Sequence, residues 1–183
     1  MAYFGPTIVP HATYDEFRNA VLGNGYDMDG WYGPQCWDGA DLIWYQYGLT
    51  LYTGPQGYAV ECWTVSRSRN AVYPFTDIYT GPQGIKRGDI VVFAATSGNP
   101  AGHIAYADED YNGGPTLSCL GQNQGPGSGA SGLPFNIWPN NASEIIGAFR
   151  NTNWQGTPPP TPTGKKHKFP WVLVARKFRS GTR

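Results

Sequence analysis

Two short helices followed by a series of strands are predicted by the pattern of apolar and polar positions along the chain. In residues 13–23 the apolar side chains repeat at helical spacing behind a Thr-x-x-Glu capping box. A second apolar stripe of the same period covers residues 36–48 and places Cys36 in or near the first turn of its helix. This order predicts an α+β domain with an antiparallel sheet, in which residues 49–88 are mainly turns and residues 124–142 form a long loop. The strands are expected in four short apolar runs between Gly-, Asn- and Pro-rich turns, at residues 89–95, 103–107, 116–120 and 144–149.

Composition argues against several classes of protein, but it does not indicate a ligand. The chain has 183 residues, with 13 Lys and Arg against 13 Asp and Glu, so no overall field favours nucleic acid or an acidic partner. No apolar run reaches the length of a membrane-spanning helix. The first residues show no basic stretch followed by an apolar one, so no secretory signal is predicted. Three Cys without a Cys-x-x-Cys pair predict neither a disulfide framework nor a zinc site, and leave at least one thiol free.

Three segments of different composition are predicted along the chain. Residues 1–155 form the folded domain. Residues 156–164 contain the run TPPPTPT, which is typical of an extended proline-rich linker. Residues 165–183 form a tail that combines aromatic residues with more than half of the chain's Lys and Arg, and has no acidic residue. The domain is therefore acidic and the tail basic, although the total charge is zero.

Acidic residues gather just before the second predicted helix. Asp27-x-Asp29-Gly30 has the form of the start of a calcium loop, because alternate acids and a glycine can wrap oxygens around a hard cation. A third acid, Asp38, follows nine residues after Asp29. Taken alone, the pattern is more typical of an Asx-type turn.

A cysteine at the start of a helix is a candidate nucleophile. The N–H groups and the dipole at this helix end are expected to lower the pKa of the Cys36 thiol and favour the thiolate. A base is needed beside it, and the chain has three histidines. His11 lies in the lead-in and His167 in the tail, whereas His103 begins an apolar strand. His103 is therefore the candidate base, and a structural histidine is the alternative.

Five motifs in order give a more specific interpretation. They are DMDGWYGPQCWDGADL around Cys36, IKRGDIVVF at 85–93, GHIAYADE at 102–109, LSCLGQNQG at 117–125 and IIGAFR at 145–150. Over residues 13–151 the chain resembles the CHAP family of cysteine, histidine-dependent amidohydrolases and peptidases, especially those of phage enzymes that cut peptidoglycan. The resemblance implies a papain-like (NlpC/P60-like) α+β fold, with N-terminal helices packed on an antiparallel sheet.

The resemblance also implies a set of catalytic residues. Cys36 would be the nucleophile, His103 the general base, and Gln35 a donor to the oxyanion. Many relatives carry Glu-x-Asn after the histidine strand, whereas this chain has Gly121-Gln122-Asn123. We therefore expect Asn123 to orient His103 in a Cys-His-Asn arrangement. Whether Gln122 or an acid from elsewhere in the chain compensates for the missing carboxylate stays open.

A calcium site is implied by the same resemblance. Some relatives bind calcium just before the nucleophile, which here corresponds to the carboxylates of Asp27, Asp29 and Asp38. The carbonyl oxygens of Trp31 and Gly33 would complete the coordination. The ion would fix the loop that leads to the nucleophile.

The predicted function is hydrolysis of an amide bond in peptidoglycan, either as an N-acetylmuramoyl-L-alanine amidase or as a stem or cross-bridge endopeptidase. The protein would be a phage endolysin, made in the host cytoplasm and acting on the cell wall. The alternatives are a wall-degrading protein carried in the phage tail or virion, or an inactive wall-binding structural protein. The tail at 165–183 would bind anionic wall polymers or a phage tail protein.

Overall fold

The computed structural model describes residues 11–78 and 81–155 of the chain. The predicted linker at 156–164 and the predicted tail at 165–183 lie outside the described residues. Within the described part, no helix has both the length and the apolar character that crossing a membrane requires.

The first helix, α1 (Tyr14–Val21), begins where the capping box predicts. The Thr13 side chain accepts a hydrogen bond from the Glu16 N–H at 3.2 Å, and the Glu16 carboxylate accepts one from the Ala12 N–H at 2.9 Å. The second helix, α2 (Cys36–Gln46), begins at Cys36 itself. Both predicted helices are confirmed. Two helices of one turn each, α3 (Glu61–Thr64) and α4 (Arg67–Asn70), lie in the segment predicted as turns.

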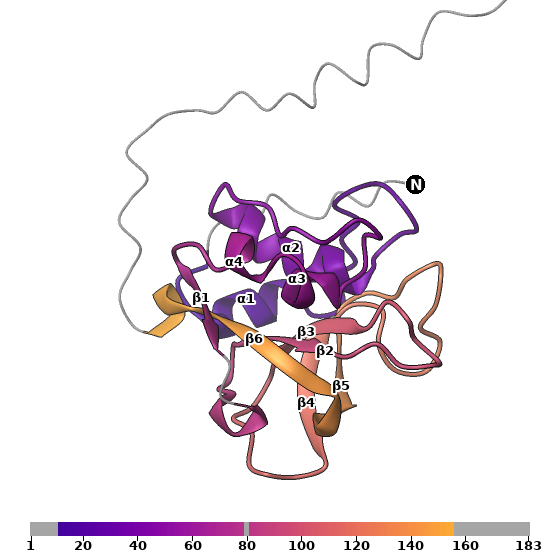
Figure 1. Ribbon diagram of the computed structural model, residues 1–183. Helices are drawn as coiled ribbons and strands as arrows, with labels where there is room; N and C mark the ends of the chain where they lie inside the picture. Colours follow the sequence, from indigo (N-terminus) through magenta and orange to yellow (C-terminus); the bar gives the residue numbers. More distant parts are fainter. Residues whose placement is uncertain (1–10, 79–80, 156–183) are drawn as a thin grey trace, which may run out of the picture.

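Six strands form one antiparallel sheet in the order β1-β6-β2-β3-β4-β5. The α-helices of the described residues, α1 to α4, all lie on the same side of this sheet (Figure 1). The predicted α+β class is therefore confirmed. The strands are β1 (Phe75–Ile78), β2 (Ile90–Phe93), β3 (His103–Ala107), β4 (Thr116–Gly121), β5 (Asn136–Asn141) and β6 (Ile145–Asn151).

The four predicted strands are confirmed as β2, β3, β4 and β6, whereas the two edge strands were not predicted. β1 has four residues, and β5 has the sequence NIWPNN, in which Asn and Pro are poor strand formers. An edge strand tolerates Pro139 because one of its sides needs no hydrogen-bonding partner. The predicted loop at 124–142 therefore contains a strand.

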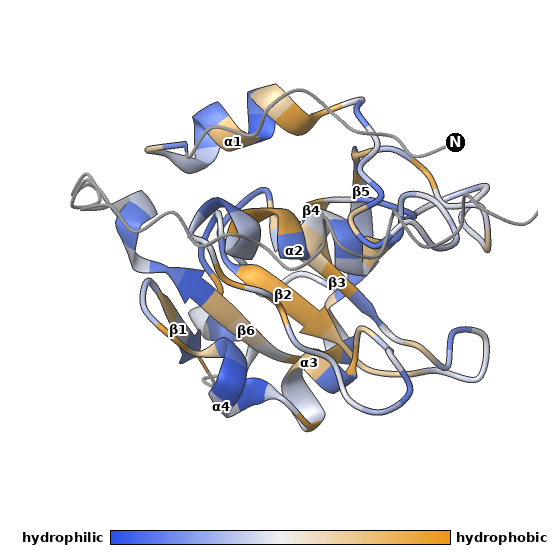
Figure 2. Ribbon diagram, turned by 90° about the horizontal axis from the view of Figure 1, so that it is seen from above, coloured by the Kyte–Doolittle hydropathy of each residue, from blue (hydrophilic) through white to orange (hydrophobic). Residues whose placement is uncertain are grey.

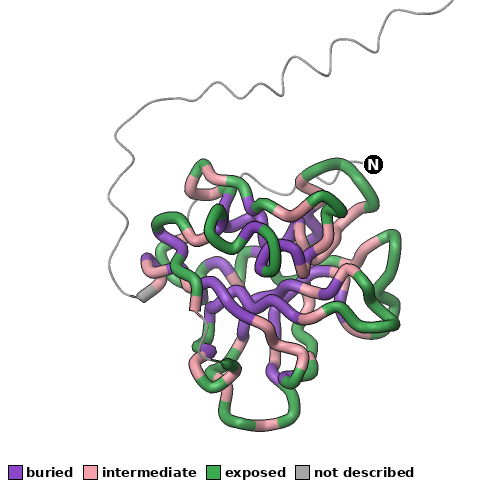
Figure 3. Tube along the Cα trace, viewed as in Figure 1, coloured by how far each residue is buried: buried purple, intermediate pink, exposed green. Residues whose placement is uncertain are grey.

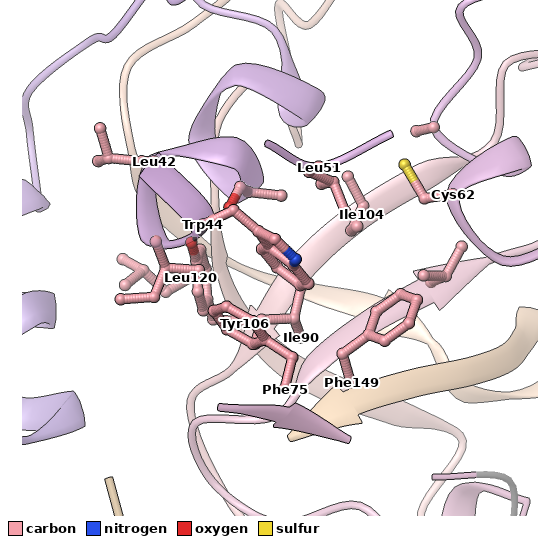
Figure 4. Packing of buried hydrophobic residues seen from close by; sticks show 14 of the residues in the cluster. Leu42, Trp44, Leu51, Cys62, Phe75, Ile90, Ile104, Tyr106, Leu120 and Phe149 are labelled. Atoms are coloured by element: carbon pink, nitrogen blue, oxygen red, sulfur yellow. Dashed lines mark hydrogen bonds between the residues drawn. The ribbon is translucent and has the colours of Figure 1, made fainter. Parts of the chain in front are cut away.

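The main core lies between α2 and the sheet. Trp44 is fully buried, stacks on Phe75 with 3.8 Å between ring centroids, and donates its indole N–H to the Asn70 carbonyl at 3.2 Å (Figure 4). Seen from above the helices, the strongest apolar character lies in β2 and β3 (Figure 2). These central strands are also buried, whereas the surrounding loops are mostly exposed (Figure 3).

Side chains of β3 alternate between the two faces of the sheet, and this alternation determines which of them face α2. Ile104 and Tyr106 belong to the core beneath α2, while Ala105 belongs to a smaller cluster on the opposite face. The Tyr106 hydroxyl donates to the Gly39 carbonyl at 2.8 Å and so ties β3 to the first turn of α2. The helix start and the strand start are thereby held together.

Candidate active site

Cys36 is the first residue of α2, and its side chain lies against the start of β3. The backbone N–H of Ile104 is directed at the Cys36 sulfur. That nitrogen belongs to the peptide bond that follows His103, so the thiol contacts the main chain at the candidate base. Cys36 is half-buried, whereas Cys62 and Cys119 are fully buried. Of the three thiols, Cys36 alone is placed to meet a substrate.

The thiol of Cys36 is neutral in the resting protein. Burial raises its pKa to about 11, although the N–H groups of Ile104 and Trp37 act in the opposite direction. The negative charge of Asp38 adds to the increase. The prediction of a resting thiolate is therefore wrong, because desolvation raises the pKa more than the N–H groups at the helix start lower it. Proton transfer to a base must accompany attack by the sulfur.

His103 is the first residue of β3 and is half-buried. Burial lowers the pKa of its imidazole to about 4, and the Gln124 side chain opposes this. The ring is thus neutral near pH 7 and able to accept a proton. Among the described residues, the imidazole and the thiol of Cys36 form no direct hydrogen bond. Such bonds are often long before substrate binds, so the arrangement is compatible with a catalytic pair.

Gln124, and not Asn123, is the side chain beside His103. The His103 Nε2 atom lies 3.1 Å from Gln124 Oε1. Asn123 instead donates from Nδ2 to Gln35 Oε1 at 2.6 Å and to the Gly129 carbonyl at 2.9 Å. The contact predicted for Asn123 is therefore made by its neighbour, and Asn123 holds the loop that follows β4.

Gln35 joins two loops beside the nucleophile. Its Nε2 donates to the Tyr32 carbonyl at 2.8 Å and to the Ala130 carbonyl at 3.3 Å. Its predicted contact with an oxyanion would require these hydrogens to leave their carbonyl partners, and this role stays a prediction. The backbone N–H groups of Cys36 and Trp37 are directed at the sulfur and are alternative donors.

Gln122 is a positioning residue for the loop that precedes Cys36. It is fully buried, and its Oε1 accepts the Tyr26 N–H at 2.6 Å. Its Nε2 donates to the carbonyls of Tyr26 and Gln35, each at 2.9 Å. Gln122 thus ties both ends of the acidic loop to the end of β4. The alternation of β4 was the available signal, since it places residue 122 on the same face as Leu120, towards α2.

The three predicted acids converge in the loop before Cys36. Oxygen atoms of Asp27, Asp29 and Asp38 lie within 4.8 Å of one another. Asp38 is buried, and its two oxygens accept the N–H groups of Met28 at 2.8 Å and Gln35 at 2.9 Å. Asp38 therefore fixes the loop to the helix start even without an ion.

The electrostatics of this cluster suit a cation. Burial, together with the charges of Asp29 and Asp27, raises the pKa of Asp38 to about 7. Partial desolvation and the charge of Asp27 likewise raise the pKa of Asp29, although the residue is exposed. Within the described residues, no ion pair involves any of the three carboxylates. An oxygen-binding divalent ion would relieve the repulsion between them.

The Asx-type turn that was the alternative is also present. Asp27 Oδ1 accepts the Gly30 N–H at 2.8 Å, and Asp29 Oδ1 accepts the Trp31 N–H at 2.7 Å. Gly33 has φ = 70°, a conformation that favours glycine. The turn and an ion site are compatible, because each carboxylate oxygen can accept more than one interaction. The carbonyl oxygens of Trp31 and Gly33 stay predicted ligands.

Glycine at position 132 allows a second loop to pack against the nucleophile loop. Gly132 has φ = 68°, and a methyl group there would collide with the Pro34 backbone. We expect Gly132→Ala to lower the free energy of unfolding by about 2 kcal/mol, measured by urea denaturation. Gly129→Ala in the same loop is the matched control, because a methyl group there meets open space. Equal stability of both variants would contradict the close packing.

A known protein resembles the chain in sequence, and a solved structure resembles it in fold. A D-alanyl-L-alanine endopeptidase of Streptococcus phage B30 is 38% identical over 125 residues, which are 67% of this chain and 27% of the relative. The crystal structure of the wild-type endolysin LysIME-EF1 matches with a TM-score of 0.62 and 27% identity, over 75% of this chain and 62% of the endolysin chain. The chain thus spans about a quarter of the first protein and under two thirds of the second.

A family match covers the part of the chain that contains the candidate site. The CHAP domain family matches residues 23–123, which are more than half of the chain. This range contains the acidic loop, Cys36 at the helix start and His103 at the strand start. The chain therefore belongs to the CHAP domain family.

Proposed function

We propose that the protein hydrolyses an amide bond in bacterial peptidoglycan, with Cys36 as nucleophile and His103 as general base. The observation that carries the proposal is the half-buried thiol at a helix start, held against the main chain of a neutral histidine in a CHAP domain. The named activity of the phage B30 relative makes a D-alanyl-L-alanine peptide bond the first substrate to test. An N-acetylmuramoyl-L-alanine amide is the other candidate.

Acylation would proceed from neutral groups. The imidazole of His103 takes the thiol proton while the Cys36 sulfur attacks the carbonyl carbon of the substrate amide. Backbone N–H groups at the start of α2 stabilise the negative charge that develops on the carbonyl oxygen. The carbon–nitrogen bond then breaks, and the imidazolium gives its proton to the leaving amine.

Deacylation would restore the enzyme with one water molecule. His103 accepts a proton from the water as its oxygen attacks the thioester carbonyl. The carbon–sulfur bond breaks, and the proton returns to the Cys36 sulfur. The products are one new amino group and one new carboxyl group on the wall peptide.

Clearing of Gram-positive cells or purified walls is the direct test of this proposal. We expect a suspension treated with the full chain in the presence of calcium to lose turbidity. If the protein clears none of the wall types offered but still binds to walls, the result would support an inactive wall-binding protein instead.

We also propose that Asp27, Asp29 and Asp38 bind Ca²⁺ together with the carbonyl oxygens of Trp31 and Gly33. The converging carboxylates and the raised pKa values of Asp29 and Asp38 support this donor set. The ion would supply charge neutralisation and fix the loop that leads to Cys36. Correct placement of a nucleophile has a large effect on rate.

Removal of calcium is expected to destabilise the protein. An ion at about 100 times its dissociation constant stabilises the folded state by about 2.7 kcal/mol. The melting temperature should therefore fall by several degrees when calcium is replaced by a chelator. Asp29→Asn should abolish this response, while the exposed control Asp77→Asn should keep it. A wild-type melting temperature that is the same in calcium and chelator would contradict the site.

We also propose a delivery route for the protein and a role for the basic segment at 165–183. The protein would reach the wall either as a free endolysin or as part of a virion. Residues 165–183 would attract anionic wall polymers, and this attraction should weaken as salt increases. Co-sedimentation of the full chain with purified walls at low and high salt tests this. Binding that salt does not change would favour a protein partner.

A further inference from the structure

The space beside His103 that a side chain at position 121 would occupy is filled from elsewhere in this chain. A methyl group on Gly121 would lie 3.2 Å from both Cδ and Oε1 of Gln124, and 2.9 Å from the Ala105 methyl group. Gly121 and His103 lie on the same face of the sheet, because they follow the alternation of Cys119 and Ala105. The absence of a side chain at 121 therefore leaves room for the carboxamide of Gln124.

The orientation of this carboxamide is determined by its partners. Gln124 Nε2 donates to two carbonyl oxygens, of Cys119 at 2.8 Å and Asn136 at 2.9 Å. Both of its hydrogens are thereby used, and Oε1 must face the other way. Oε1 accepts the Asn140 side-chain N–H at 3.0 Å and lies 3.1 Å from His103 Nε2. Since Oε1 can only accept, His103 Nε2 must carry the hydrogen.

We propose that Gln124 is the positioning residue for His103, replacing the absent side chain at position 121. It holds the imidazole as the Nε2–H tautomer and leaves Nδ1 as the acceptor for the thiol proton of Cys36. The positioning rests on the contacts above. Its catalytic meaning rests on the proposed function.

The surroundings of Gln124 make this arrangement rigid. Gln124 is 4% exposed, and its backbone carbonyl accepts the Asn136 side-chain N–H at 3.1 Å. The two influences on the pKa of His103 are burial and the Gln124 amide, with no charged group among the described residues contributing. The centroid of the Phe93 ring lies 5.9 Å from that of the imidazole. Burial thus keeps the ring uncharged, and the neutral amide orients it.

Nuclear magnetic resonance of the full-length protein tests the proposal without any wall substrate. Long-range proton–nitrogen correlations at neutral pH report which ring nitrogen of His103 carries hydrogen, with His103→Gln providing the assignment. We expect pure Nε2–H in the wild type and a mixture of tautomers in Gln124→Met. A mixture in the wild type, or an unchanged pattern in Gln124→Met, would overturn the proposal.

Two further variants separate positioning from general stability. Gln124→Glu keeps the acceptor, so it should keep the Nε2–H form and raise the pH at which His103 titrates by about one unit or more. An unshifted titration would overturn the proposal. Gln122→Met breaks buried hydrogen bonds to Tyr26 and Gln35 but does not touch His103, so it should lose stability and keep the tautomer. The same tautomer mixture in Gln122→Met as in Gln124→Met would also overturn it.

The kinetic consequence is tested only where the wild type clears walls. Gln124→Met should then lower the hydrolysis rate about 10- to 100-fold, as is typical when a positioning partner is removed. Gln124→Glu should move the acidic limb of the rate–pH profile upward together with the His103 titration. An inactive wild type with the expected tautomer would refute the proposed function and leave the positioning intact. An active wild type whose rate Gln124→Met leaves unchanged would refute the positioning role alone.

Discussion

Cys36→Ala should abolish wall hydrolysis, with a loss of about 10³-fold or more in the initial rate of clearing. The sulfur is the atom that forms the covalent intermediate, and no other described thiol is accessible. Since Cys36 is half-buried at a helix start, its truncation should change stability little. The measurement is the rate of turbidity loss at equal protein concentration, with circular dichroism to confirm folding.

The matched control for this variant is Cys62→Ala. Cys62 is a fully buried thiol of α3 and belongs to the main core (Figure 4). We expect its replacement to cost some stability and to keep most of the activity. Clearing by Cys36→Ala at a rate near that of the wild type would rule out the thiol mechanism.

Asp38→Ala should have the second-largest effect, because this carboxylate has two roles. It accepts the N–H groups of Met28 and Gln35, and it is one of the three converging acids. Its removal leaves buried donors without partners, which should lower the free energy of unfolding by about 3 kcal/mol even in a chelator. Activity should be lost and should not return in excess calcium. Urea denaturation in chelator and clearing assays in calcium measure the two effects.

Asp29→Asn separates the two roles of the acidic loop. Asp29 is exposed and accepts one local N–H, so its stability in chelator should stay close to that of the wild type. It should lose the calcium response alone. If Asp38→Ala and Asp29→Asn were equally stable in chelator, the hydrogen bonds of Asp38 would not hold the loop as described.

The central part of the fold is predictable from the sequence, and its edges are not. β2 and β3 carry uninterrupted apolar runs because helices cover one of their faces and a second cluster covers the other. β5 has the sequence NIWPNN and pairs with β4 along one of its sides. Its other side is a sheet edge and needs no hydrogen-bonding partner, so Pro is tolerated there. Edge strands are less buried than central ones, so fewer of their residues have to be apolar. Their signal in a single sequence is therefore weak.

The candidate site divides in a similar way. Cys36, His103 and the three acids are predictable because each lies in a short local motif. Which side chain lies beside His103 depends on a turn after β4, and no local sequence motif predicts this turn. Asn123 has φ = 52°, so the chain reverses after Gln122 and brings Gln124 back over Gly121. Position 124, rather than 123, therefore lies beside the imidazole.

Mass analysis of the fragments released from purified walls is the most direct test of the central claim. The wild type should produce peptides with new amino and carboxyl ends at an amide bond, and no new reducing sugar ends. Cys36→Ala and His103→Ala, assayed in parallel, should release none of these fragments. New sugar ends from the wild type, or the same peptides from Cys36→Ala, would contradict amide hydrolysis by this thiol and imidazole.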